Sequence, residues 1–156
     1  MIRWRHSLIA LTVAMAGGIT PGHASDNHMD VELRFFGSIC VATAPGLSDR
    51  DVRAAAKKLV ASKIKLGPGS NFISSAGKSC GASFRWNGEK LSAVPEAKAK
   101  RMVQDLAKRI GASDVSLEAG QGGKALKYTV KADKYQFTLI FEVKGSERLY
   151  SISKHR

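Results

Sequence analysis

Apolar and polar residues alternate through the last part of the chain, from Lys124 to Lys154. The alternation runs through three segments, and short stretches of turn residues separate them. A period of two is that of a pleated strand, whose successive side chains point to opposite faces. The pattern therefore predicts an antiparallel three-strand meander whose apolar face needs a cover, while its polar face can stay in water. The apolar face consists of Leu126, Tyr128, Val130, Tyr135, Phe137, Leu139, Phe141, Val143, Tyr150 and Ile152.

Two other segments show the spacing of three and four residues that an amphipathic helix requires. The first follows Ser48, a favourable N-cap, and runs for about four turns until Gly67-Pro68-Gly69 breaks it. The second begins at Pro95 and extends to Ile110, with Gly111 as its stop. Their apolar stripes predict that both helices pack on the meander, in a two-layer α+β sandwich.

Shorter patterns add strands to this sheet. Residues 29–36 alternate between apolar and polar types, which predicts an N-terminal strand. Phe84 and Trp86 alternate with polar neighbours ahead of Asn87-Gly88, a typical hairpin turn, so we expect a hairpin whose second arm is residues 89–93. Residues 70–81 have little pattern and predict a loop, Val115 and Leu117 indicate a short strand, and Gly120 to Gly123 predict a flexible link into the meander.

The first 24 residues are typical of a secretory signal. Arg3 and Arg5 precede a short apolar run, and small residues end the segment at Ala24. The run is shorter than the roughly 20 apolar residues of a membrane-spanning helix. We therefore expect cleavage after Ala24, a flexible tail over residues 25–30 and a single domain over residues 31–156. The predicted location is the periplasm in a bacterium, or otherwise the outside of the cell.

Cysteine usage fits that compartment. The chain has two cysteines, Cys40 and Cys80. In an oxidising compartment an isolated pair favours a disulfide, which here would close a loop of about 40 residues. A reactive or redox thiol is the alternative, but the spacing is far from Cys-x-x-Cys and no histidine is near either residue in sequence.

Catalytic patterns are weak. Ala76 to Ser79 resembles the end of a phosphate-binding loop, but Phe72 stands where that motif needs glycine. Ser-x-x-Lys occurs three times, with Ser75 and Lys78 the only pair worth testing in a chain so rich in both residue types. Of the histidines, His28 and His155 lie at opposite ends of the predicted mature chain, so a catalytic triad or a metal centre lacks its usual imidazole. The sequence predicts no cofactor, no metal site and no enzymatic activity. A copper- or nickel-binding terminus at residues 26–28 would need cleavage after Ser25.

Positive charge is the strongest compositional feature. The formal net charge is +12 at pH 7, and loss of Arg3 and Arg5 would leave about +10. Such an excess favours polyanionic partners, although a solvated basic surface is an equally simple interpretation. The candidate binding residues are the basic side chains of the second helix and of the outer meander face, together with the predicted hairpin, where Trp86 could be either a contact or part of the core. They are Arg85, Trp86, Lys98, Arg101, Lys108, Lys127, Lys131 and Lys134.

These features predict an exported binding protein without catalytic activity. Its expected partner is an anionic lipid, an acidic polysaccharide or an acidic protein, and the compartment makes nucleic acid the least favoured anion. The alternative is an inhibitor or immunity protein in which a disulfide-tied loop, residues 70–81, blocks a partner enzyme or toxin. The oligomeric state has no signal in the sequence.

Overall fold

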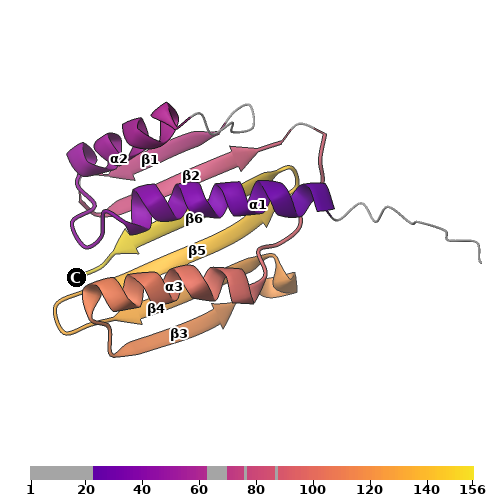
Figure 1. Cartoon of the computed structure of the whole chain (residues 1–156). Coiled ribbons are helices and arrows are strands. Elements are labelled where there is room, and N and C mark those ends of the chain that lie inside the picture. The colour runs from indigo at the N-terminus through magenta and orange to yellow at the C-terminus, as the bar shows by residue number, and fades with distance from the viewer. Residues whose placement is uncertain (1–22, 63–69, 76, 87) are drawn as a thin grey trace, which may run out of the picture.

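The structure is a computed structural model that describes residues 23–62, 70–75, 77–86 and 88–156. This part of the chain forms a six-stranded antiparallel sheet with helices packed on one face (Figure 1), which confirms the predicted two-layer α+β fold. The strand order is β1-β2-β6-β5-β4-β3. The strands are β1 (Asn71–Ser75), β2 (Ser79–Arg85), β3 (Asp114–Ala119), β4 (Ala125–Lys131), β5 (Gln136–Lys144) and β6 (Glu147–Lys154).

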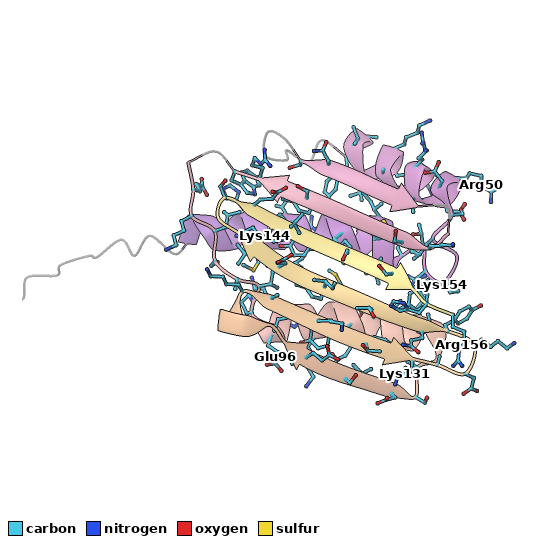
Figure 2. The ribbon with its side chains drawn as sticks, turned by 180° about the vertical axis from the view of Figure 1, so that it is seen from behind. Arg50, Glu96, Lys131, Lys144, Lys154 and Arg156 are labelled. Carbon is cyan, nitrogen blue, oxygen red and sulfur yellow. A yellow bond between two sulfur atoms is a disulfide. The ribbon has the colours of Figure 1, made fainter. Side chains whose placement is uncertain are left out.

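The helices lie side by side across the sheet in Figure 1. Helix α1 (His23–Phe36) crosses its middle and continues into the π-helix η1 (Gly37–Val41), while α2 (Asp49–Ala61) lies at the β1 end. Helix α3 (Glu96–Ile110) covers the other half of the sheet, next to β4, and a short 3-10 turn, η2 (Gln121–Gly123), precedes β4. Figure 2 shows the opposite face of the sheet, which the described helices leave uncovered.

The meander has the predicted strands and the predicted faces. Tyr128 is opposite Leu139, and Phe141 is opposite Tyr150, so the apolar positions of β4, β5 and β6 meet on the helix side of the sheet. Aromatic rings dominate this core, and Phe36 of α1 packs edge-on against Phe141 and tilted against Tyr150. The predicted short strand at Val115 and Leu117 is also confirmed as β3, which lies at the edge of the sheet and leaves both side chains partly exposed.

Capping residues explain where α2 begins and where α3 ends. The Ser48 hydroxyl accepts a hydrogen bond from the backbone N–H of Asp51 at 3.1 Å, as predicted for the start of α2. Gly111 ends α3 in the left-handed conformation, with φ of +64°, which glycine adopts without steric cost. The predicted breaker at Gly67 to Gly69 and the end of the helix predicted before it lie outside the described residues.

The predicted N-terminal strand at residues 29–36 is wrong, because this segment is the end of α1. Met29, Leu33 and Phe36 are buried at helical spacing, but Glu32 and Phe35 are buried as well. A helix that crosses the middle of a sheet buries a wide face, and its sequence can then resemble a strand by chance. Residues 25–30, expected as a flexible tail, lie within the same helix.

The predicted loop and hairpin around β2 are also wrong. Residues 70–81 contain β1 and the start of β2, which form an antiparallel hairpin with each other. Residues 89–93 form no strand, because β2 already has β1 and β6 as its two neighbours. Instead the chain leaves the sheet after β2 and leads to α3. Asn87 of the expected hairpin turn and residues 1–22 of the expected signal lie outside the described residues.

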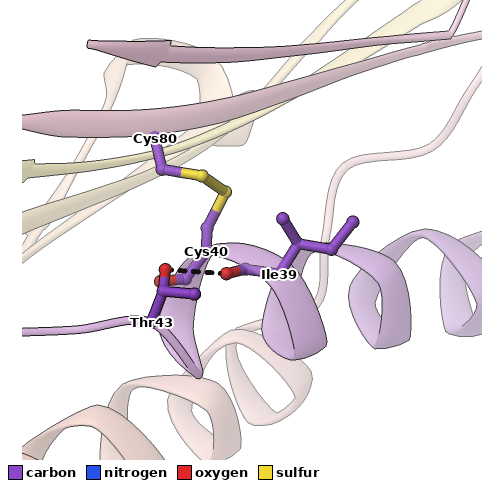
Figure 3. Close-up of a disulfide and its surroundings, with 4 residues drawn as sticks. All are labelled: Ile39, Cys40, Thr43 and Cys80. Atoms are coloured by element: carbon purple, nitrogen blue, oxygen red, sulfur yellow. Dashed lines mark hydrogen bonds between the residues drawn. A yellow bond between two sulfur atoms is a disulfide. The ribbon is translucent and has the colours of Figure 1, made fainter. Parts of the chain in front are cut away.

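The predicted disulfide joins Cys40 of η1 to Cys80 of β2 (Figure 3). Both cysteines are buried, and their Cα atoms are 5.4 Å apart. Next to the bond, the Thr43 hydroxyl donates to the carbonyl of Ile39 at 2.8 Å, where the helical segment ends. Because the bond occupies both thiols of the chain, the alternative of a reactive thiol is wrong.

Candidate functional site

A groove of about 870 Å³ lies between α1 and α3 on the helix side of the molecule. The two helices run parallel, since Asp30 in the middle of α1 meets Lys98 near the start of α3, and Gly37 after α1 lies next to Met102 farther along α3. The part of α3 that borders the groove, from Lys98 to Arg109, is about 16 Å long at about 1.5 Å per residue. The groove is therefore long and open rather than a closed cavity.

Glycine at position 37 shapes the middle of this groove. A Cβ atom there would lie 3.2 Å from the Cε of Met102, closer than an ordinary van der Waals contact. Gly37 thus lets η1 approach α3 without a side chain between them. Gly37 is also the first residue of the π-helical turn. The groove is lined by Ser38 and Val41 of this turn and by Ala42, which caps it. Single π-helical turns are rare and occur frequently at functional sites.

The charge of the groove is strongly positive. Among the described residues that line it, five are cationic and two are acidic, which gives a net formal charge of +3. The cations are Arg34 of α1 and Lys98, Arg101, Lys108 and Arg109 of α3, and the acids are Asp30 and Asp105.

Few of these charges neutralise one another. Lys98 donates to the Asp30 carboxylate at 2.6 Å. The other four cations form no ion pair within 4.0 Å with any carboxylate in the described part of the chain. Arg34 from one wall and three cations from the other therefore face a shared space without ion pairs to described carboxylates, although Asp105 lines the same groove. Met102 and Gly37 form a partly accessible apolar floor between the two walls, whereas Leu33 and Val41, which also line the groove, are buried in the core.

The structure brings together three of the eight binding residues predicted from the sequence. Lys98, Arg101 and Lys108 all line the groove. Sequence reasoning missed Arg34, because the segment was interpreted as a strand. The signal was present, since Asp30, Arg34 and Ser38 recur every four residues, as do Leu33, Gly37 and Val41.

The other predicted cations lie apart from the groove. Arg85 pairs with Glu147 at 3.3 Å across the β2–β6 register, and Lys127 pairs with Glu118 at 2.8 Å. Both pairs are on the uncovered face of the sheet. Lys131 ends β4 and Lys134 lies in the following turn, where both are exposed (Lys131 is labelled in Figure 2).

The remaining predicted residue, Trp86, belongs to a buried polar network under α1. Its indole N–H donates to the Glu32 carboxylate at 2.7 Å, and its ring stacks on His28 with 3.6 Å between centroids. The Tyr150 hydroxyl donates to Glu32 at 2.6 Å, and Arg148 forms an ion pair with it at 3.1 Å. Trp86 therefore connects the end of β2 to α1, and its side chain is partly buried.

The charged centre of the network is closed to solvent. The side chains of Glu32 and Arg148 are both 0% exposed, and Arg148 also donates from Nε to the carbonyl of Ser92 at 3.2 Å. Burial raises the pKa of Glu32, an effect that the Tyr150 hydroxyl, Arg148 and Trp86 oppose. Burial, together with the nearby Glu32, raises the pKa of Tyr150 well above 10, so its hydroxyl stays a donor. Because the enclosed Glu32 carboxylate bonds to Arg148 and Tyr150, it fixes the position of α1 on β6.

The chemistry available elsewhere is limited. The described residues contain no group of three or more His, Cys, Asp or Glu side chains placed to hold a metal ion. Residues 77–79 lead into β2 of a hairpin and not into a helix, so the phosphate-binding loop that Ala76 to Ser79 resembled is absent. Within the described ranges, no helix is both long and apolar enough to cross a membrane.

No family model, curated protein or solved structure matches this chain.

The uncovered face offers a test of local electrostatics at Glu147. The Ser83 hydroxyl donates to this carboxylate and, with the smaller contribution of Arg85, lowers its pKa below the usual 4.5. A lowered pKa in the folded state means that the stabilisation is present above pH 4.5 and is lost as the pH falls through the folded pKa. We expect Ser83→Ala to raise the pKa of Glu147 and to reduce the loss of folding stability that follows protonation of this carboxylate. Carboxyl titration by NMR measures the pKa; that of Asp51, which Ser48 lowers, should not change.

Proposed function

We propose that the protein is an exported binding protein without catalytic activity, and that the groove between α1 and α3 is its binding site for an anionic ligand. The observation that carries this proposal is the set of four cations, Arg34, Arg101, Lys108 and Arg109, that face one groove without ion pairs to described carboxylates. Cations held near one another repel, and an anion that enters the groove relieves that repulsion.

Two further features support the proposal. The disulfide between Cys40 and Cys80 is compatible with an oxidising compartment outside the cytosol. The basic side chains of the outer sheet face are less suited to recognition, because Arg85 and Lys127 already pair with carboxylates. Binding through the groove would place the ligand over α1 and α3, the two helices that cover the centre and one half of the sheet.

The test is a charge reversal on both walls of the groove. The protein, purified after expression of the full chain, is titrated with anionic phospholipid vesicles, an acidic polysaccharide and poly-glutamate. We expect binding to at least one probe, and we expect Arg34→Glu combined with Arg101→Glu to weaken it at least about tenfold, because like charges across an interface cost several kcal/mol. Binding should also weaken as salt rises, since exposed charges are screened within about 8 Å at physiological ionic strength.

The matched control is Lys131→Glu combined with Lys134→Glu, which changes the net charge equally at the β4–β5 turn. We expect this variant to retain most of the affinity. Equal loss in both variants would mean that the overall charge, and not the groove, attracts the anion. If instead a single protein partner is captured in a 1:1 complex and its activity is blocked, the inhibitor interpretation would replace the present one.

A further inference from the structure

The cations of the groove are distributed along its length. Lys98 lies near the start of α3, Arg101 follows one turn later, and Lys108 and Arg109 lie in its last turn. Arg34 occupies the opposite wall, on α1. A ligand that satisfies these groups together must carry several negative charges spaced over about 16 Å, and not one anionic head.

The floor of the groove adds a second requirement. Met102 and Gly37, which are in close approach, are the partly accessible apolar residues between the charged walls, and the buried Leu33 and Val41 also line the groove. A purely polar polyanion would leave this apolar strip without a partner. The ligand that matches both features carries an apolar stripe flanked by acidic groups, which is the surface of an acidic amphipathic helix.

The alternatives fit the groove less well. A bilayer surface is flat on this scale, so anionic headgroups could meet the exposed ends of Arg101 and Lys108 while the apolar floor stayed in water. A single acyl chain would need an enclosed tunnel, whereas the groove is open along its length. From the charge complementarity of the walls and the apolar floor, we infer that the groove takes an acidic amphipathic helix of a partner protein. This inference rests on the proposed function and names its ligand class.

The inference is tested with a random peptide library of about four helical turns, selected on the protein purified after expression of the full chain. We expect the enriched peptides to be rich in Asp and Glu, with apolar residues three and four positions apart. Fluorescence polarisation with an enriched peptide should show binding at least about tenfold weaker for the Arg34→Glu and Arg101→Glu variant, and nearly unchanged binding for the Lys131→Glu and Lys134→Glu variant.

A floor variant separates this inference from simple anion binding. Met102→Gln keeps the length and the charge of the groove but removes apolar contact, so it should weaken the enriched peptide by about threefold or more and leave poly-glutamate binding unchanged. Circular dichroism of each variant checks that the fold is retained. Loss of peptide binding together with retained poly-glutamate binding supports the amphipathic ligand.

Three results would overturn the inference. Enriched peptides without acidic residues or helical spacing would contradict the ligand class. Equal peptide affinity for the unmodified protein and for the Arg34→Glu and Arg101→Glu variant would contradict the groove as the binding site. Groove-dependent binding of anionic vesicles with no enriched peptide would retain the proposed function and reject the helix as its ligand. If no anionic probe responds to Arg34→Glu and Arg101→Glu, both proposals fail together.

Discussion

Replacement of Glu32 by glutamine is expected to lower the free energy of unfolding by about 3–5 kcal/mol at neutral pH. The substitution keeps the shape of the side chain but removes the carboxylate charge that lies 3.1 Å from the buried Arg148 guanidinium. It also replaces one acceptor oxygen by an N–H₂ group. Tyr150 could turn its hydroxyl to accept from this group, but the indole N–H of Trp86 can only donate. Urea unfolding followed by fluorescence measures the change.

Two controls show whether this loss comes from burial of the pair. Glu118→Gln breaks the exposed ion pair with Lys127 and should cost at most about 1 kcal/mol. The double substitution Glu32→Leu and Arg148→Met removes both buried charges and should be more stable than either single variant. If Glu32→Gln were no more costly than Glu118→Gln, the network would not hold α1 on β6 as described.

Removal of the disulfide is expected to cost about 4 kcal/mol in the chain-entropy model, because the bond closes a loop with a sequence separation of 40. Unfolding of Cys40→Ala combined with Cys80→Ala, compared with the oxidised protein, measures this loss. The bond joins η1, which carries part of the groove, to β2 in the sheet. Its removal should therefore also weaken ligand binding by loosening one groove wall.

Chemical reduction provides the matched control, since the reduced protein keeps both sulfur atoms. The reduced protein and the double alanine variant should lose similar amounts of unfolding free energy. The variant should lose somewhat more, because it also lacks the packing of the two buried sulfur atoms. A thiol assay on the denatured, unreduced protein should detect no free thiol. Two free thiols, or an unfolding midpoint that reductant does not change, would contradict the role of the bond.

The meander and two of the helices were predictable because their signals are local. The alternation from Tyr135 to Val143 and the capping residues Ser48 and Gly111 act within a few neighbours along the chain. The pairing of β2 with β6 depends on residues about 70 positions apart. Local turn chemistry at Asn87-Gly88 therefore predicted a hairpin that the sheet does not form.

The candidate site was only half predictable for the same reason. The α3 wall followed from basic residues on a helix identified in the sequence, whereas the α1 wall required Arg34 to be assigned to a helix. Buried Glu32 concealed that assignment, because a charged residue between Val31 and Leu33 resembles the polar face of a strand. Its partner Arg148 is 116 residues away, so the sequence contained no local reason to bury it.

The order of the strands has a consequence for how the chain is made. Strand β6 follows all the other described strands in the sequence, yet it lies between β2 and β5 and carries the Arg148 and Tyr150 partners of α1. While the chain is being synthesised, β2 thus lacks one of its two neighbouring strands, and Glu32 of α1 lacks its Arg148 and Tyr150 partners, until the residues of β6 have been added. We therefore expect the sheet to be completed only after β6 has been synthesised, and such late completion is compatible with the export proposed above.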